Sequence, residues 1–343
     1  MLKRAEKHGS KFQNPVPTSV GGFNTMFKIL PLYMSNRAET EPKHPLGPFH
    51  TDARIYAQPP ASGLRVTWFG HSSSLLEIDG LRILIDPVWE QRASPVQWMG
   101  PKRFFEPTLG LDDLPELDAI LISHDHYDHL GAGTIRRLSR LNATARTKWF
   151  TSVGVGQRLR DFGVAGAQIA ELDWTQSGEI AGAELAQGVR LTAWPARHFS
   201  GRKPWDRFTT LWSSFVIEGP KHRVYFGADS GLWPGFTEIA ERYDRFDLTM
   251  LEIGAFHPLW ADIHLGPDGA AEAYRRLGGP EKAGPLLPVH WGLFNLALHG
   301  WREPIERLTS IAAQEGWKLW LPEPGKPTEV RQEASPAELW WQR

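Results

Sequence analysis

One short stretch of the chain, "SHDHYDHL" at residues 123–130, holds three histidines and two aspartates within six positions. It directly follows the apolar run "AILI", which is typical of a strand. Alternate side chains of an extended chain point the same way, so we expect His124, His126 and Asp128 to converge on one point while the residues between them face elsewhere. His129 follows where the chain turns, and we expect it to face a neighbouring point. The stretch therefore predicts two adjacent metal sites.

The residue types in this stretch are those of a metal site built without sulfur. Neutral imidazoles and carboxylates suit zinc or another first-row divalent ion. The chain contains no cysteine, which excludes disulfides, thiolate ligands and a cysteine nucleophile, and favours an open, catalytic site over a closed, structural one. A polar turn of hydrogen-bonded histidines is the simpler alternative. Because each buried unpaired polar group costs about 1–3 kcal/mol, a cluster this dense favours a bound ion.

Three further candidate ligands stand at the ends of other apolar runs. His198 ends "LTAWPARH", Asp229 ends "RVYFGAD" and His290 ends "LLPVH". Taken alone, each would be read more readily as a cap or a surface residue. Because all three share their position with the histidine-rich stretch, we predict that they complete its metal sites.

The elements that must position these residues begin at about residue 61. Three short runs rich in β-branched and aromatic residues, separated by turns, predict an antiparallel meander. These runs are 64–70, 73–79 and 81–89. The run 118–126 is apolar over most of its length, which indicates a strand buried on both faces. A helix is expected over 131–143, with Ile135, Leu138 and Leu141 at helical spacing.

The second half of the chain repeats the succession of strands and helices with different residues. Strands are expected over 189–198, 211–219, 222–231, 284–292 and 317–323, and helices over 234–243, 268–278 and 303–316. Two such successions predict an α/β fold of two packed sheets with helices outside, a four-layer αβ/βα sandwich. We place this domain at residues 61–330, between an extended, proline-rich N-terminal arm (1–60) and a C-terminal tail (331–343).

The charge balance and the lack of long apolar runs limit partners and location. With 38 basic and 39 acidic residues among 343, the formal charge is −1, so no global field attracts nucleic acid. The chain has no secretory apolar region and no run of about 18 apolar residues. We therefore expect a cytoplasmic protein that binds no nucleic acid. The loops "QWMGPKRFF" (97–105) and "HFSGRKPWDRF" (198–208) mix aromatic and basic residues, which suits a phospholipid or small-molecule substrate and peripheral contact with the inner membrane face. Ordinary solvated loops with buried tryptophans are the alternative.

The histidine-rich stretch resembles the H-x-H-x-D-H signature of the metallo-β-lactamase fold superfamily. The resemblance implies seven ligands, with one metal held by His124, His126 and His198, the other by Asp128, His129 and His290, and Asp229 bridging the two. A histidine rather than a glutamate at position 126 is similar to the hydrolytic zinc branch and unlike the di-iron redox branch.

Longer segments resemble one family of that superfamily, the N-acyl-phosphatidylethanolamine-hydrolysing phospholipases D. They are "LIDPVWEQRASPVQWMGPKRF" (84–104), "FGADSG" (226–231), "VHWGLFNLALH" (289–299) and, in the arm, "FQNPVPT" (12–18). The resemblance implies a phosphodiester hydrolase that cleaves such lipids with two zinc ions per chain, for which iron or manganese could substitute. It also implies a homodimer, and a hydroxide shared by the ions as nucleophile, with Asp128 and Asp229 as catalytic residues.

Three more residues are candidates for supporting roles. His264 in "DIHLGPDGAAEA" resembles the family's histidine in an H-x-x-P-x-x-A segment and is assigned to the phosphate or the leaving group. Its alternative role is to start a helix. His71 in "WFGHSSS" and Asp86 in "LIDPVW" stand at strand ends, and we expect them to hold metal ligands by hydrogen bonds. A purely structural role is the alternative for both.

Two other functions are compatible with these residues. The same fold and metals could serve a lactonase or another small-molecule ester or phosphoester hydrolase, because function depends on the site and not on the fold. A non-catalytic zinc scaffold is the second alternative. It predicts the loss of at least one ligand, whereas all seven positions are filled.

Overall fold

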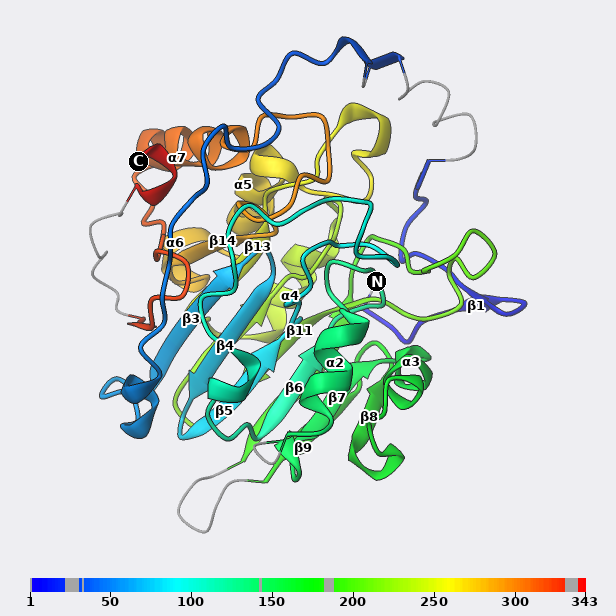
Figure 1. Cartoon of the computed structure of the whole chain (residues 1–343). Coiled ribbons are helices and arrows are strands. Elements are labelled where there is room, and N and C mark those ends of the chain that lie inside the picture. Colours follow the sequence, from blue (N-terminus) through cyan, green and yellow to red (C-terminus); the bar gives the residue numbers. More distant parts are fainter. Residues whose placement is uncertain (1, 22–30, 33, 142–143, 182–187, 331–338) are drawn as a thin grey trace.

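Two β-sheets stack face to face, with helices on their outer sides (Figure 1). The structure, a computed structural model, describes residues 2–21, 31–32, 34–141, 144–181, 188–330 and 339–343. An apolar core fills the space between the sheets. The predicted αβ/βα sandwich of the metallo-β-lactamase fold is confirmed.

The sheets contain seven and six strands. The first has the order β15-β3-β4-β5-β6-β7-β8, with β3 (Leu64–Gly70), β4 (Ser73–Ile78), β5 (Leu81–Ile85), β6 (Ala119–Ile122), β7 (Lys148–Ser152), β8 (Ile169–Leu172) and β15 (Thr328–Glu329). The second has the order β14-β13-β12-β11-β10-β9, with β9 (Ser177–Ile180), β10 (Val189–Pro195), β11 (Ser213–Glu218), β12 (Arg223–Phe226), β13 (Leu248–Glu252) and β14 (Leu286–Val289). A separate hairpin pairs β1 (Lys7–His8) with β2 (Lys11–Phe12).

Each sheet is antiparallel in one part and parallel in the other. Strands β3, β4 and β5 form the predicted meander, and β5 to β8 pair in parallel. In the second sheet β9 to β12 are antiparallel, whereas β12, β13 and β14 are parallel. Consequently β3, β5 and β6 run in one direction in the first sheet, and β10, β12, β13 and β14 share a direction in the second.

Strand β6 shows how the sequence pattern builds the layers. Ala119 and Leu121 join the core between the sheets, while Ile120 and Ile122 pack in a second apolar cluster with residues of α2 and α3. Side chains alternate across a strand, so an all-apolar strand needs a cover on both faces. The prediction that this strand is buried on both faces is confirmed.

The helices divide between the two outer sides. Helices α2 (Ala132–Leu138) and α3 (Val155–Asp161) cover the first sheet, and α4 (Gly235–Arg242), α5 (Gly266–Arg276), α6 (Gly279–Lys282) and α7 (Glu303–Glu315) lie on the side of the second. Short 3₁₀ turns are η1 (Ala53–Ala57), η2 (Leu111–Asp113), η4 (Gly166–Gln168), η5 (Pro258–Trp260) and η6 (Trp340–Gln342). The helix expected over 131–143 ends earlier, at Leu138.

The prediction of a strand over 317–323 is wrong. This segment makes only an isolated bridge, between Leu286 and Leu319. Trp320 donates to the carbonyl of Leu286 at 2.9 Å, but Pro322 has no N–H to continue a ladder. The apolar residues of the segment are buried without forming a strand.

Both terminal segments pack against the sandwich. The backbone N of Leu2 donates to Glu238 of α4 at 3.0 Å. Trp340 is buried with its ring centroid 5.9 Å from that of Trp68 and 5.2 Å from that of Trp291, so the end of the predicted tail completes the core. Residues 331–338 of that tail lie outside the described residues. Within the described part of the chain, no helix is both long and apolar enough to cross a bilayer.

Candidate metal centre

The predicted ligands lie at the carboxyl ends of strands that share a direction within their sheets. His124 follows β6, His198 follows β10, Asp229 follows β12 and His290 follows β14. All four are buried. Because side chains that leave neighbouring strand ends meet at one edge, residues far apart in the sequence gather at a single centre.

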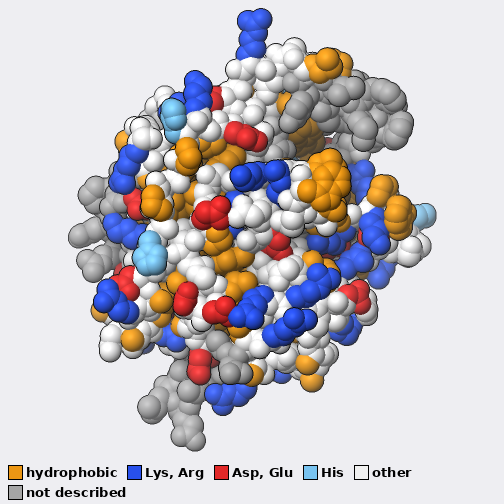
Figure 2. Space-filling model, viewed as in Figure 1, with side chains coloured by type: hydrophobic (Ala, Val, Ile, Leu, Met, Phe, Trp, Pro, Cys, Tyr) orange, Lys and Arg blue, Asp and Glu red, His pale blue; other side chains and the backbone are white. Residues whose placement is uncertain are grey.

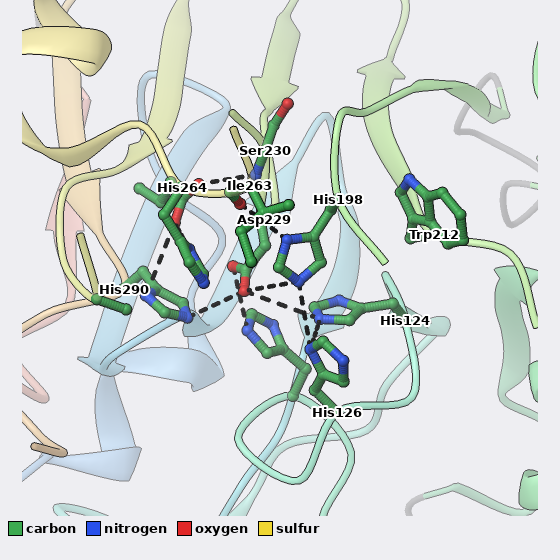
Figure 3. A network of polar contacts seen from close by, with 12 residues as sticks. His124, His126, His198, Trp212, Asp229, Ser230, Ile263, His264 and His290 are labelled. Carbon is green, nitrogen blue, oxygen red and sulfur yellow. Dashed lines mark hydrogen bonds and ion pairs between the residues drawn. The ribbon is translucent and has the colours of Figure 1, made fainter. Parts of the chain in front are cut away.

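The first cluster consists of His124, His126, His198 and Asp229, with ligand atoms within 4.8 Å of one another (Figure 3). Nδ1 of His126 lies 2.9 Å from Nε2 of His124 and 3.2 Å from Nε2 of His198. Nδ1 of His198 donates to the carbonyl of Ile263 at 2.8 Å, which leaves its Nε2 lone pair for a cation. Burial lowers the pKa of His124 and of His198 well below the ordinary value, so both imidazoles stay neutral, as metal binding requires.

The second cluster consists of His71, Asp128, His129 and His290, again with ligand atoms within 4.8 Å. Oδ2 of Asp128 lies 2.9 Å from Nε2 of His71 and 3.2 Å from Nε2 of His290. Nε2 of His129 is 3.5 Å from the same oxygen. Burial alone would lower the pKa of His290, but the carboxylates of Asp229 and Asp128 outweigh it and raise the pKa to about 10. Without a bound cation, these carboxylates favour the positively charged form of His290.

This grouping corrects the expectation drawn from strand alternation. Asp128 was expected to share a point with His124 and His126, but it lies with His129 in the second cluster. The physical reason is that the chain stops being extended after His126. Residues 127–129 form a turn in which N of His129 donates to the His126 carbonyl at 3.1 Å. The grouping implied by the family resemblance places Asp128 with His129, as observed.

Asp229 lies between the two clusters. Its Oδ2 is 3.1 Å from Nε2 of His290, and 3.6 Å and 3.8 Å from Nε2 of His198 and His124. Its Oδ1 and Nε2 of His129 are buried 3.2 Å apart, yet neither has a hydrogen-bond partner among the described residues. Each buried polar atom without a hydrogen-bond partner lowers the stability of the fold by about 1–3 kcal/mol. Cations held by the clusters would satisfy both atoms, so the residues present fit a two-metal centre.

Asp86 and His71 support the clusters from behind. Oδ2 of Asp86 lies 2.8 Å from Nδ1 of His129, and His71 contacts Asp128 as described, so both predicted hydrogen bonds are present. His71, Asp86 and His290 have φ angles of 54°, 40° and 62°. This left-handed region is uncommon for residues other than glycine, and backbone strain of this kind gathers at functional sites. The bend at these strand ends turns the side chains toward the centre.

Glu252, the last residue of β13, is a site residue that sequence reasoning missed. It is fully buried, and its Oε2 accepts a hydrogen bond from Nδ1 of His264 at 2.6 Å. Its Oε1 accepts from the backbone N of Ser230 and of Leu265 at 2.7 Å and 3.1 Å. Figure 3 shows the ring of His264 turned toward the clusters beside His290. Burial raises the pKa of Glu252. Its only sequence signal is an acidic residue at the end of an apolar strand.

The N-terminal arm also reaches the centre, which the sequence did not predict. The side chain of Asn14 makes two hydrogen bonds with the backbone of His198. Its Nδ2 donates to the carbonyl at 2.7 Å, and its Oδ1 accepts from the N–H at 2.9 Å. Arg197 donates to the carbonyl of Pro17 at 2.8 Å and to the hydroxyl of Thr18 at 3.1 Å. The arm therefore fixes the end of the strand that carries a candidate ligand.

A pocket of about 430 Å³ opens onto both clusters. Its polar lining includes His126, Asp128, Asp229, His264 and His290. Its apolar wall includes Val20, Phe199, Trp260, Ile263 and Leu296, and Arg207 adds a guanidinium. A few convergent polar groups in a largely apolar concavity are typical of a small-molecule site.

Comparison with known proteins places the chain in a family. Residues 81–291 match the family model described as the beta-lactamase superfamily domain. An uncharacterized protein of Mycobacterium tuberculosis is 44% identical over 283 residues, which cover 82% of this chain and 72% of that protein. The N-acyl-phosphatidylethanolamine-hydrolyzing phospholipase D 1 of Caenorhabditis elegans is 35% identical over 260 residues, which cover 73% and 70%.

A solved structure agrees with the fold. The metallo hydrolase Igni18 of the archaeon Ignicoccus hospitalis superimposes with a TM-score of 0.56 at 24% identity, over 78% of this chain and 98% of that one. The family model, the similar proteins and the two His/Asp clusters all indicate a metal-dependent hydrolase. The chain belongs to the beta-lactamase superfamily and is one of its metal-dependent hydrolases.

Proposed function

We propose that the protein is a phosphodiester hydrolase that cleaves N-acyl-phosphatidylethanolamine-like lipids as a phospholipase D, with two zinc ions. The observation that carries the proposal is the pair of His/Asp clusters joined by Asp229 and open to a largely apolar pocket. A lipid needs both parts of this site, the centre for its phosphate and the apolar wall for its chains. The 35% identity to a nematode enzyme named for this reaction supports the substrate class.

The seven predicted ligands have distinct places in this proposal. One ion would be held by His124, His126 and His198 and the other by Asp128, His129 and His290, with Asp229 between the two clusters. Ions in such a site supply a nucleophile from water near neutral pH and offset negative charge around phosphorus. Nitrogen and oxygen ligands also accept iron or manganese. Asp128 is partly exposed in the pocket, so its carboxylate can orient a water molecule.

His264 is assigned to the leaving group. It lines the pocket, and because its Nδ1 is bonded to Glu252, its Nε2 is the atom available to a substrate. An alcohol that leaves phosphorus needs a proton on its oxygen, and a positioned general acid contributes roughly 10²–10⁴-fold to such a step. Glu252 acts through His264 and is a positioning residue.

Two exposed loops suit a lipid surface. Trp98 in the loop 89–105 and Trp205 in the loop 199–209 are 75% and 74% exposed, and Nζ of Lys203 lies 5.6 Å from the Trp205 ring centroid. Figure 2 shows exposed hydrophobic side chains next to Lys and Arg on one face of the molecule. Aromatic and basic side chains together favour the interface of an anionic bilayer. We therefore propose that the protein also contacts the membrane surface. The homodimer implied by the family resemblance remains a prediction.

A substrate panel tests the proposed function. The zinc-loaded protein is incubated with vesicles that contain N-acyl-phosphatidylethanolamine, and with a simple lactone, and the products are identified by mass spectrometry. We expect an N-acylethanolamine and a phosphatidic acid from the lipid. Asp229→Asn serves as the inactive control, because loss of the carboxylate between the clusters should abolish cleavage. Turnover of the lactone without cleavage of any phosphodiester would show that the proposal is wrong.

A further inference from the structure

Arg207 stands in the wall of the metal pocket. Its guanidinium carbon lies 4.7 Å from the ring centroid of Phe199. That phenyl ring lies 4.5 Å from the ring of His126 and 4.9 Å from the ring of His198. One phenyl ring therefore separates the guanidinium from two proposed metal ligands, and the cation shares the pocket with the centre.

Other arginines around the pocket already have strong partners. Arg197 pairs with Asp262 at 2.8 Å, and Arg158 pairs with Asp206 at 2.6 Å. Arg202 donates to the carbonyls of Asp125 and Leu130, both at 2.8 Å, and lies over the ring of Tyr127. These arginines hold loops together. Their N–H groups bond to other residues of the protein and are not directed at a ligand.

Arg207 differs from them. Among the described residues it has no acidic partner, and its guanidinium makes two long hydrogen bonds, to the carbonyls of Val20 and Gly21 at 3.2 Å and 3.4 Å. Its Nε is buried and has no hydrogen-bond partner among those residues. A half-buried cation without a carboxylate is costly unless a ligand supplies the negative charge.

We propose that Arg207 selects anionic substrates, because its guanidinium binds a negatively charged oxygen of the phosphodiester. The inference rests on the proposed function and adds a specificity residue to it. A diester phosphate keeps a full negative charge at neutral pH, which a planar guanidinium matches with two parallel hydrogen bonds. The carbonyl of a neutral ester or lactone carries no charge and gains much less from the same side chain. Arg207 thus favours hydrolysis of phosphodiesters over hydrolysis of lactones and other neutral esters.

The competing interpretation is that Arg207 only holds the arm in place through Val20 and Gly21. A structural role of that kind would affect neutral and anionic substrates alike. The test therefore compares two substrates with the same leaving group, bis(p-nitrophenyl) phosphate and the neutral ester p-nitrophenyl acetate.

In Arg207→Gln we expect kcat/KM for the phosphate diester to fall about 10- to 100-fold, the loss expected for a hydrogen bond to a charged group. The neutral ester should be cleaved at close to the wild-type rate, and Arg207→Lys should recover part of the loss. Arg146→Gln is the matched control, because it makes the same substitution at an exposed arginine outside the pocket. It should leave both substrates unaffected. Equal losses on both substrates in Arg207→Gln, or none, would overturn the inference while leaving the proposed function intact.

Calorimetry separates the two ideas if the wild-type protein cleaves no phosphodiester. Diphenyl phosphate is titrated into zinc-loaded wild-type and Arg207→Gln protein, and the dissociation constants are compared. A dissociation constant at least about tenfold higher in the variant supports the role of Arg207 even if the proposed function is wrong. Equal affinity, or no measurable binding to the wild type, overturns it.

Discussion

Glu252 shows how a buried carboxylate can influence a reaction without touching the substrate. Its two oxygens accept hydrogen bonds from Nδ1 of His264 and from the backbone N of Ser230 and Leu265. A buried negative charge with three donors is held in one orientation. The contact fixes the orientation of the His264 ring, with its Nδ1 bonded to the carboxylate.

Glu252→Gln should therefore affect substrates according to their leaving group. The amide keeps the shape of the side chain but removes the charge that faces His264. We expect kcat to fall about 100-fold for a phosphodiester with an alkyl alcohol as leaving group, because that alcohol needs a proton. Bis(p-nitrophenyl) phosphate, whose nitrophenolate leaves without a proton, should react at nearly the wild-type rate.

The matched control for this variant is Glu241→Gln, on the exposed side of α4. It should leave the steady-state rates on both substrates unchanged. If Glu252→Gln lowers both rates equally, the variant has damaged the centre itself and Glu252 has no specific effect through His264.

At the scale of elements, the sequence could predict those ligands that directly follow a strand. His124, His198, Asp229 and His290 each follow an apolar run, and that pattern is visible without a structure. Strand alternation grouped Asp128 wrongly, because a turn decides its place, whereas the family resemblance grouped it as observed. Strands β8 and β9 are largely exposed edge strands without a continuous apolar run, so no strand was predicted there. The contact of the arm with His198 depends on residues 184 positions apart, which no local pattern encodes.

The arm should control how tightly the metal is held. In Asn14→Ala both hydrogen bonds to the backbone of His198 are lost, which frees the end of β10. Groups that orient a metal ligand typically contribute 10- to 100-fold to metal affinity, so zinc should pass to a chelating dye about tenfold faster than from the wild type.

The neighbouring residue supplies the control for this experiment. Among the described residues, the side chain of Gln13 bonds only to the backbone carbonyls of Lys11 and Phe12, so Gln13→Ala should release zinc at the wild-type rate. Circular dichroism checks that both variants are folded. Wild-type zinc release from folded Asn14→Ala would show that the arm does not support the ligand.

On the scale of the whole molecule, the centre joins the two sheets. The first cluster combines His124 and His126, which follow a strand of the first sheet, with His198 and Asp229 from the second. The second cluster likewise combines residues of the first sheet with His290 of the second. Metal bound at either cluster would therefore hold the two halves of the sandwich together, so metal binding and folding should be thermodynamically linked.

Removal of the metal should lower the thermal stability of the entire domain. A ligand that binds only the folded state adds about 1.4 kcal/mol for each tenfold excess over its dissociation constant. In differential scanning calorimetry, chelated protein should melt several degrees lower than zinc-loaded protein. Added zinc should restore the melting temperature, whereas magnesium, which avoids imidazole ligands, should not. An identical melting temperature with and without zinc would contradict a centre that joins the sheets.

One side of the pocket wall comes from a different part of the chain than the metal ligands. Val20 and Gly21 line it from the arm, which supplies no candidate ligand, whereas the ligands come from strand ends of the sandwich. Substitutions at these two positions can therefore reshape this side of the pocket while Asn14 keeps its hydrogen bonds to His198. Relatives that keep all seven ligands and Asn14 but differ at these positions would then prefer different substrates.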